Sequence, residues 1–197
     1  MKGYTDKTSI QNYLLTEIDS SFEDQLNAFI EQAEDIIDQQ TDRNFKADST
    51  DSARLYDGDG ERDILIDDCQ SVSKVRIGTP DGVIESEDEV PGTDYKLYPA
   101  NEKPKTKIRL LYGRATRGSQ NVEVTGKWGY SASVPAAIRF VATVLVAGMI
   151  QAAGPKSDSD VQSMTVGRYT VTYKNKDQIT DYQRAMDTLE TYKKYTF

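Results

Sequence analysis

The stretch from residue 57 to residue 68 carries the side chains best suited to chemistry, because its acids are spaced as in a calcium-binding loop. Five acids fall at loop positions 1, 3, 5, 7 and 12: Asp57, Asp59, Glu61, Asp63 and Asp68. Position 6 of such a loop must be glycine, and this chain has Arg62 there. Position 12 is an aspartate in place of the longer bidentate glutamate. We therefore expect the Asp-Gly-Asp-Gly run at 57–60 to form a hairpin turn, with no bound metal and no cofactor.

The chain offers few groups for nucleophilic or acid–base catalysis. Its 197 residues include no histidine, which removes Ser-His and Cys-His pairs and the commonest general base. Cys69 is the only cysteine, so it cannot form an intrachain disulfide, and we expect it to be a small, partly buried hydrophobic residue. A hydrolase that works with two carboxylates, as glycosidases do, stays open as an alternative, although no sequence feature selects a pair. We expect that the chain is not an enzyme.

Opposite charges are separated along the chain. With 24 basic and 32 acidic residues the net charge is −8, which argues against tight nucleic-acid binding over the whole surface. One predicted helix carries a row of acids: Glu23, Asp24, Glu31, Glu34, Asp35 and Asp38. Cations gather elsewhere: Lys103, Lys105, Lys107, Arg109, Arg114 and Arg117. Such a row is commonly a solvated face, but separated opposite charges also suit an interface between copies. That second interpretation assigns these residues to the interface: Glu31, Glu34, Lys105, Lys107 and Arg109.

Three capping boxes and the period of the apolar residues predict three amphipathic helices. The boxes are at Thr8–Gln11, Ser20–Glu23 and Thr180–Gln183, and the second helix carries the acidic row and extends to Asn44. The last helix carries a mostly aromatic stripe: Tyr182, Met186, Leu189, Tyr192 and Tyr195. Such a stripe is usually core, but in this position it also suits docking to a partner.

A fourth helix, at 134–153, is the most apolar segment of the chain. It follows a strand that ends at Trp128 and Gly129, and Pro135 falls in its first turn, so we expect these three residues to anchor the fold. A helix that is apolar on nearly all sides is expected to be buried on nearly all sides. Arg139 and Gln151 interrupt the apolar run, which argues against a membrane span. We expect a protein that stays in the cytoplasm where it is made.

Alternating segments between residues 49 and 132 predict an antiparallel meander of about five to seven short strands. Arg54–Tyr56 and Ile64–Ile66 are expected to flank the hairpin turn. After the apolar helix, a mobile polar loop is expected from Gly154 to Gln162, and a hairpin over Met164–Tyr173. The fold class is thus α+β: a bundle of about four helices with an inserted antiparallel β-rich meander and β-hairpins. The expected segments are 1–48, 49–132 and 133–197, of which the first and last form one discontinuous domain.

The order of these segments resembles the head-tail connector (adaptor) proteins of long-tailed bacteriophages. The similarity covers most of the chain: the N-terminal helix pair, the DGDG turn before an apolar strand, VEVTGKWGYSASVPAAIRFVATVLVAG, and VQSMTVGRYTVTY before the last helix. Its most specific parts are Trp-Gly-Tyr at 128–130 followed by Val-Pro, and the pattern S-x-x-V-G-x-Y-x-V-x-Y at 163–173. The larger β-rich middle, Ala53–Trp128, departs from the family, whose members pack helices into a bundle with hairpin loops.

The resemblance implies a structural role without catalysis. Subunits of the family form a ring, usually of twelve, beneath the portal protein, where the ring extends the DNA channel and meets head-closure (stopper) or tail proteins. For this chain it implies a homo-oligomer in the neck of the virion, contact with the portal, and double-stranded DNA that passes without sequence-specific binding. No membrane partner is implied. The alternative is a carbohydrate- or partner-binding β module of a phage tail or cell surface, which depends on whether Trp128 is accessible to sugars or buried.

Overall fold

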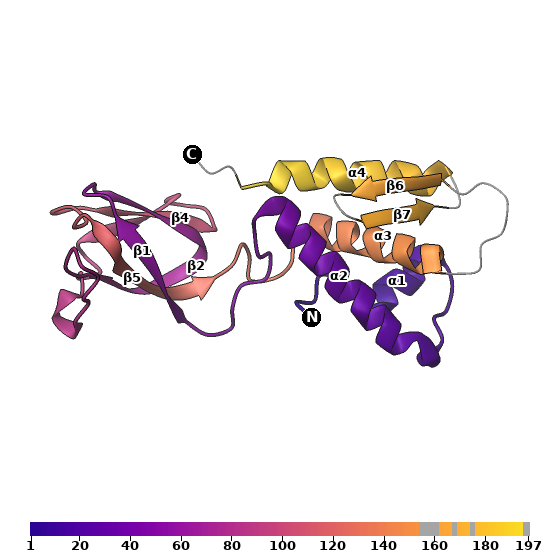
Figure 1. The fold of residues 1–197 in the computed structure, drawn as a ribbon, viewed down its shortest axis with the longest axis horizontal. Helices are drawn as coiled ribbons and strands as arrows, with labels where there is room; N and C mark the ends of the chain where they lie inside the picture. Colours follow the sequence, from indigo (N-terminus) through magenta and orange to yellow (C-terminus); the bar gives the residue numbers. More distant parts are fainter. Residues whose placement is uncertain (154–161, 167–168, 174–175, 195–197) are drawn as a thin grey trace. The chain divides into compact units, whose positions relative to one another are not determined.

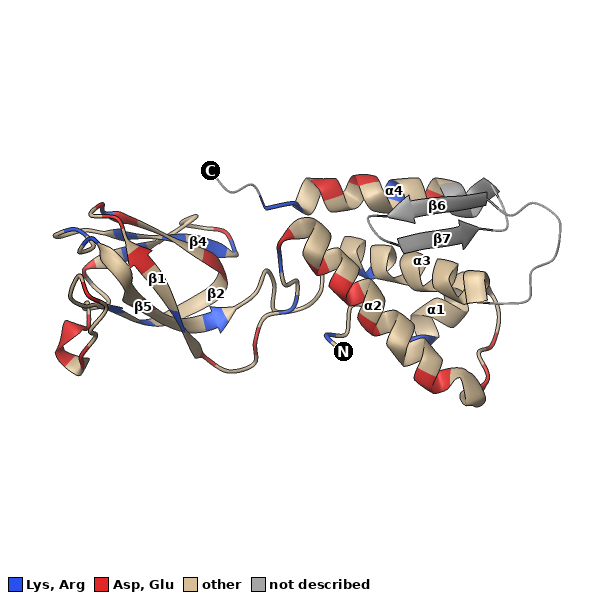
Figure 2. Cartoon of the chain, in the orientation of Figure 1, with Lys and Arg blue, Asp and Glu red and all other residues tan. Residues whose placement is uncertain are grey.

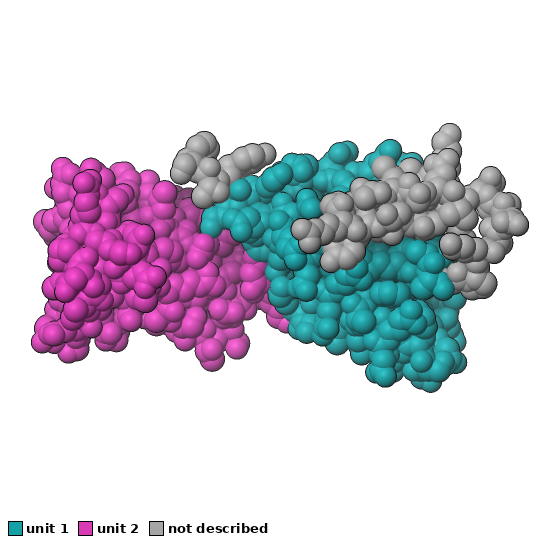
Figure 3. All heavy atoms as spheres, viewed as in Figure 1, with its two compact units in different colours: residues 1–43, 134–197 teal, residues 44–133 magenta. Residues whose placement is uncertain are grey.

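The computed structural model describes residues 1–153, 162–166, 169–173 and 176–194. The chain divides into two compact units, which are coloured separately in Figure 3. Unit 1 combines residues 1–43 with residues 134–197, and unit 2 is the segment 44–133 between them. Four helices and a five-stranded antiparallel sheet confirm the α+β fold class within the part of the chain that is described.

Unit 1 is built around one apolar helix. Its helices are α1 (Lys7–Leu14), α2 (Glu23–Thr41), α3 (Ala136–Ala153) and α4 (Lys176–Tyr192). The other three helices all contact α3, and the short hairpin of β6 (Gln162–Val166) and β7 (Tyr169–Tyr173) adds β7 to the same helix (Figure 1). Every residue from Val141 to Met149 is buried, which confirms that a helix apolar all round is a core helix here.

The length and composition of α3 would also allow it to cross a membrane. More than half of its residues are buried inside the structure, however, as in the core helix of a globular unit. The loop expected from Gly154 lies outside the described residues, apart from Gln162 at its end.

The helices of unit 1 begin at other residues than the capping boxes predict. The Asp6 carboxylate accepts the Ser9 N–H at 2.8 Å and so caps α1. A short 3₁₀ turn, η1 (Ser20–Phe22), precedes α2 and is capped by Asp19. Because α4 already starts at Lys176, Thr180 lies inside it and cannot be its cap. Pro135 directly precedes α3, where its carbonyl accepts the Arg139 N–H. The starts of α1 and of η1 are thus set by a carboxylate just upstream of the predicted cap.

Unit 2 is an antiparallel sheet, but the predicted meander is wrong. The strands are β1 (Ser52–Gly58), β2 (Asp63–Ile77), β3 (Tyr95–Tyr98), β4 (Lys105–Leu110) and β5 (Gly118–Trp128), with a 3₁₀ turn η2 (Ser86–Asp88). Their order in the sheet is β1-β5-β2-β4-β3. The last strand therefore lies between the first two, and the DGDG turn joins strands that are not hydrogen-bonded neighbours.

One long strand replaces two predicted ones. β2 runs over 15 residues, and its pairing shifts between Leu65 and Cys69 and again up to Lys74. Its first part pairs with β4 and its last part with β5, so one strand serves two partners. Bulges of this kind bend a strand and increase its local twist. The bend is what allows β5 to enter between β1 and β2.

The core of unit 2 lies on the inner face of this sheet. Its buried members are Ile64, Ile66, Cys69, Val75, Ile108, Leu110, Ala115, Val122, Val124 and Trp128. Cys69 belongs to this core and is fully buried, where a partly buried residue was expected, and burial raises the pKa of its thiol. Trp128 is 1% exposed, its Nε1 donates to the Ser52 carbonyl at 2.8 Å, and the Arg54 guanidinium lies 4.6 Å from its ring centroid. The only tryptophan is therefore fixed against β1.

Gly129 ends the last strand in a conformation that needs glycine. Its φ is +131°, and a Cβ there would lie 2.5 Å from the Cα of Ala47. Its N–H donates to the Asp68 carbonyl at 2.7 Å. The close approach brings the segment before β1 against the end of β5.

Candidate interaction surfaces

The acidic row on α2 is not a uniform solvated face. Figure 2 shows its acids in red along the helix. Glu34 is only 2% exposed, and its carboxylate accepts the backbone N–H groups of Lys2 and Gly3 at 2.6 Å and of Tyr4 at 3.0 Å. The expectation that Glu34 lies on the outer face is wrong, because a segment distant in sequence covers it. Its burial also rules it out as an accessible interface residue.

A second carboxylate of the row binds the same N-terminal segment. Asp38 accepts the Lys2 ammonium and the Tyr4 hydroxyl, each at 2.6 Å. Burial raises the pKa of Asp38, and these two donors oppose that effect. Glu31 stays on the outside, with its side chain 62% exposed. Sequence reasoning missed this arrangement, because the polar residues at 2–4 give no local signal of which helix they bind.

The basic cluster is largely paired within unit 2. Asp63 accepts Nε and Nη2 of Arg109 at 2.6 and 2.7 Å, and the Lys107 ammonium at 3.2 Å. The Arg109 and Lys107 hydrogen bonds hold the pKa of Asp63 well below its usual range. Lys105 donates to the carbonyls of Pro99 and Ala100 at 2.5 and 3.0 Å, so it stabilises the loop between β3 and β4. The predicted members Lys107 and Arg109 do lie together, but with a carboxylate between them.

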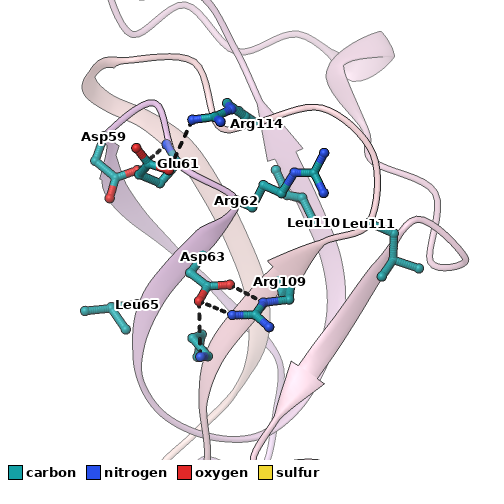
Figure 4. Close-up of a pocket in the computed structure, with 10 residues that line it drawn as sticks. Asp59, Glu61, Arg62, Asp63, Leu65, Arg109, Leu110, Leu111 and Arg114 are labelled. Atoms are coloured by element: carbon teal, nitrogen blue, oxygen red, sulfur yellow. Dashed lines mark hydrogen bonds and ion pairs between the residues drawn. The ribbon is translucent and has the colours of Figure 1, made fainter.

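These groups line a hollow of about 680 Å³ on unit 2, which we call the β2–β4 hollow (Figure 4). Its ten lining residues are Asp59, Glu61, Arg62, Asp63, Leu65, Lys107, Arg109, Leu110, Leu111 and Arg114. Asp63 and Arg109 point toward one another in Figure 4, and Arg114 lies beside Glu61, with Nη1 to Oε2 at 3.2 Å. The hollow therefore offers cations, carboxylates and leucine side chains together.

The acids of the calcium-like run bind protein groups. Asp57 accepts the Gln120 N–H at 2.7 Å, and Asp59 accepts the Glu61 N–H at 2.8 Å. Asp63 is held by Arg109. Within the described ranges, no three His, Cys, Asp or Glu side chains gather as a metal site would require. The spacing that resembles a calcium loop instead serves turn geometry and ion pairing.

Solved structures share this fold, among them two from gene transfer agent particles. A chain in the neck of an empty gene transfer agent particle, computed with C6 symmetry, superposes with a TM-score of 0.59 at 13% identity, over 100% of this chain and 92% of that chain. A chain in the virion of a native gene transfer agent particle gives a TM-score of 0.52 at 15% identity, over 87% of this chain and 78% of that one. The chain therefore shares its fold with a chain found in the neck of a gene transfer agent particle. No family model and no curated protein matches the sequence.

The stripe on α4 is part of the core of unit 1. Tyr182 and Leu189 are 2% and 4% exposed, so the expectation that they form a docking surface is wrong. Burial raises the pKa of Tyr182 to about 12. Met186 and Tyr192 are half-buried, and Tyr195 lies outside the described residues. The helix is needed by unit 1 itself, because its apolar face packs on α2 and α3.

Two side chains that bear on the alternative functions, Trp128 and Asp63, are used for packing and for ion pairing. A sugar ring cannot stack on Trp128, because the indole is buried in the sheet core. A general acid needs a pKa near the operating pH, and Asp63 is shifted the opposite way. Tyr112 is 73% exposed and places an aromatic ring at the surface of unit 2. Sequence reasoning did not identify it as a sugar-binding residue.

Proposed function

We propose that this protein is a structural component of the neck of a phage-like tailed particle, where it acts as a head-tail connector. Copies of the chain form a ring beneath the portal protein, and the ring extends the DNA channel. Its other side meets head-closure or tail proteins. The protein works in the virion and needs no catalysis or cofactor.

The observation that carries this proposal is a likeness in fold over the whole chain. The superposed neck chain is matched over 92% of its length and covers 100% of this one, so both units take part. The β-rich unit 2, which departs from the helical pattern of connector proteins in the sequence, thus has a counterpart in a neck. The independent resemblance of the sequence to connector proteins points to the same place in a particle.

The symmetry of the similar neck and the net charge of this chain support a ring around DNA. The similar neck was computed with C6 symmetry, which is compatible with rings of six or of twelve copies, and we propose twelve for this chain. A net charge of −8 disfavours tight binding to phosphates. Double-stranded DNA can therefore pass such a ring without being held in a sequence-specific way.

The proposal is tested by the mass of the protein alone and mixed with its cognate portal protein, measured by light scattering. We expect a complex whose mass corresponds to one portal ring plus a ring of this chain. Negative-stain images of the mixture should show added density on one face of the portal. A mixture in which both proteins keep their separate masses at low and moderate salt contradicts the proposal.

A further inference from the structure

The β2–β4 hollow has the composition of a protein-binding surface. Asp63 pairs in register with Arg109, and Leu65 with Lys107, so the four side chains lie on the outer face of β2 and β4. Leu65 is 68% exposed in the middle of this charged set. Arginine is enriched at protein interfaces, so an exposed leucine beside the fixed Arg109 suits a binding surface.

The cations of the hollow outnumber its carboxylates. Its four cations are Arg62, Lys107, Arg109 and Arg114, against the carboxylates of Asp59, Glu61 and Asp63. Lys107 and Arg109 share one carboxylate, and Arg62 makes no ion pair with any residue that the structure describes. The hollow therefore carries excess positive charge on a protein whose net charge is −8.

The Arg109 side chain is fixed by contacts within unit 2 and can still donate a hydrogen bond to another molecule. Asp63 takes up its Nε and Nη2, and the guanidinium lies 5.6 Å from the ring centroid of Tyr98. Among the described residues, Nη1 has no acceptor, so it can donate to a carboxylate from outside. A side chain fixed before binding loses less conformational freedom when the partner arrives.

The same unit carries an acidic loop that is complementary to the hollow. Four acids lie within five residues around η2: Glu85, Glu87, Asp88 and Glu89. The turn is held in shape because the Glu85 N–H donates to the Asp88 carboxylate at 2.7 Å. Val83, just before it, is 49% exposed. Within the described part of the chain, Glu89 pairs with Lys74 at 3.8 Å, and Glu85 and Glu87 are exposed to solvent.

We propose that the β2–β4 hollow of one copy binds the acidic η2 loop of a second copy. Leu65 would contact Val83, while Arg62 and Arg109 would meet the acids. Within one copy this contact cannot form, because the loop is tied to β2 by the Val90 N–H at the Val75 carbonyl and by the bridge of Arg76 with Glu89. Unlike surfaces that meet in this way make a head-to-tail interface, which closes into a ring when the rotation allows it.

The inference rests on the proposed ring and identifies the contact that holds it. A phosphodiester chain fits the hollow less well, because its backbone offers no aliphatic side chain to Leu65, which is 68% exposed. A polypeptide that presents acids next to a valine matches both the charges and the exposed leucine.

The test joins the two surfaces covalently in the full-length protein bound to its portal. Arg62→Cys and Glu87→Cys are placed in one chain, and oxidation should give a ladder of disulfide-linked oligomers up to the full ring. Cys69 is fully buried, so it does not compete, and Lys127→Cys with Glu87→Cys is the matched control that should give no ladder. A ring of normal mass without the ladder overturns the contact and leaves the proposed function intact. The absence of any ring when the unsubstituted protein is mixed with its portal overturns both.

Charge reversal gives a second readout. We expect Arg62→Glu or Glu87→Lys to weaken ring formation by about tenfold at low salt, with the double variant recovering most of the loss. Lys127→Glu, an exposed cation on β5, should leave assembly unchanged. If Arg62→Glu instead weakens binding to a short DNA duplex and leaves assembly unaffected, the hollow is a phosphate-binding surface and the inference is wrong.

Discussion

Glu34 accepts the backbone N–H of Tyr4 at 3.0 Å, although 30 positions separate the two residues. Two further N–H groups, from Lys2 and Gly3, bind the same buried carboxylate at 2.6 Å. A buried carboxylate is tolerated only when such donors satisfy it, and here they fix the N-terminal segment to α2. The charge on Glu34 thus contributes to the stability of unit 1.

Glu34→Gln should lower the free energy of unfolding of unit 1 by about 2–4 kcal/mol, because the neutral amide has one oxygen for three donors. Urea unfolding followed by circular dichroism measures the change. Glu31→Gln, on the exposed part of the same row, is the control and should stay within about 0.5 kcal/mol of the wild type. Equal stabilities of the two variants would contradict the role given to Glu34.

Gly129→Ala should destabilise unit 2 by about 2 kcal/mol or more, since the residue has a φ of +131° and its new Cβ would lie 2.5 Å from Ala47. Thermal unfolding monitored by Trp128 fluorescence reports on the same unit. Gly92 has no atom within 4 Å of a Cβ built on it, so Gly92→Ala serves as the control and should change stability by less than about 1 kcal/mol. If Gly129→Ala leaves the stability of unit 2 unchanged, the segment around Ala47 and the end of β5 can move apart, which contradicts their close approach.

The carboxyl group of Asp63 should titrate below the ordinary aspartate value of about 3.9. The Arg109 and Lys107 hydrogen bonds favour its charged form, so the folded-state pKa lies below the unfolded one. The stabilisation from this pair is therefore complete above about pH 4 and is lost as the pH falls below it. Carbon-detected NMR titration measures the midpoint, and Arg109→Leu should raise it. A midpoint at the ordinary value in the wild type would mean that the ion pairs do not persist in solution.

Leu189→Ala on α4 should cost about 2–4 kcal/mol of stability in unit 1, because the side chain is 4% exposed. Removal of residues 180–197 should unfold unit 1 and should not leave a folded domain that has lost only its docking surface. Loss of helical circular dichroism in the truncated protein checks this. Gln183→Ala, on the exposed side of the helix, is the control for Leu189→Ala and should stay within about 0.5 kcal/mol.

The sequence predicted best those elements whose burial can be inferred without knowing which other elements they contact. The apolar run 134–153, interrupted by Arg139 and Gln151, is typical of a buried helix, and the alternation that ends at Trp128 is typical of a half-buried strand. Periodicity alone therefore predicted α3 and most of β5, and with them the α+β class.

The errors concern contacts between residues distant in sequence. Nothing near Arg54 or Ile64 indicates that β5 lies between their strands, because strand order depends on which surfaces pack best in the complete sheet. Nothing near Glu34 indicates that residues 2–4 cover it. For the candidate site, the cluster of Lys107 and Arg109 was predicted. Asp63 was considered only as a position of a calcium-like loop, since the register that brings it to Arg109 cannot be read from one strand.

The central claim is that this chain belongs to the neck of a particle. The most direct measurement is to purify particles from cells that produce the chain with a small tag, and to locate the tag by gold labelling in electron micrographs. The account predicts label at the head–tail junction, once per particle vertex that carries a tail, with a copy number by mass spectrometry that matches a ring. Particles that lack the protein, or label spread over the capsid or along the tail, would contradict it.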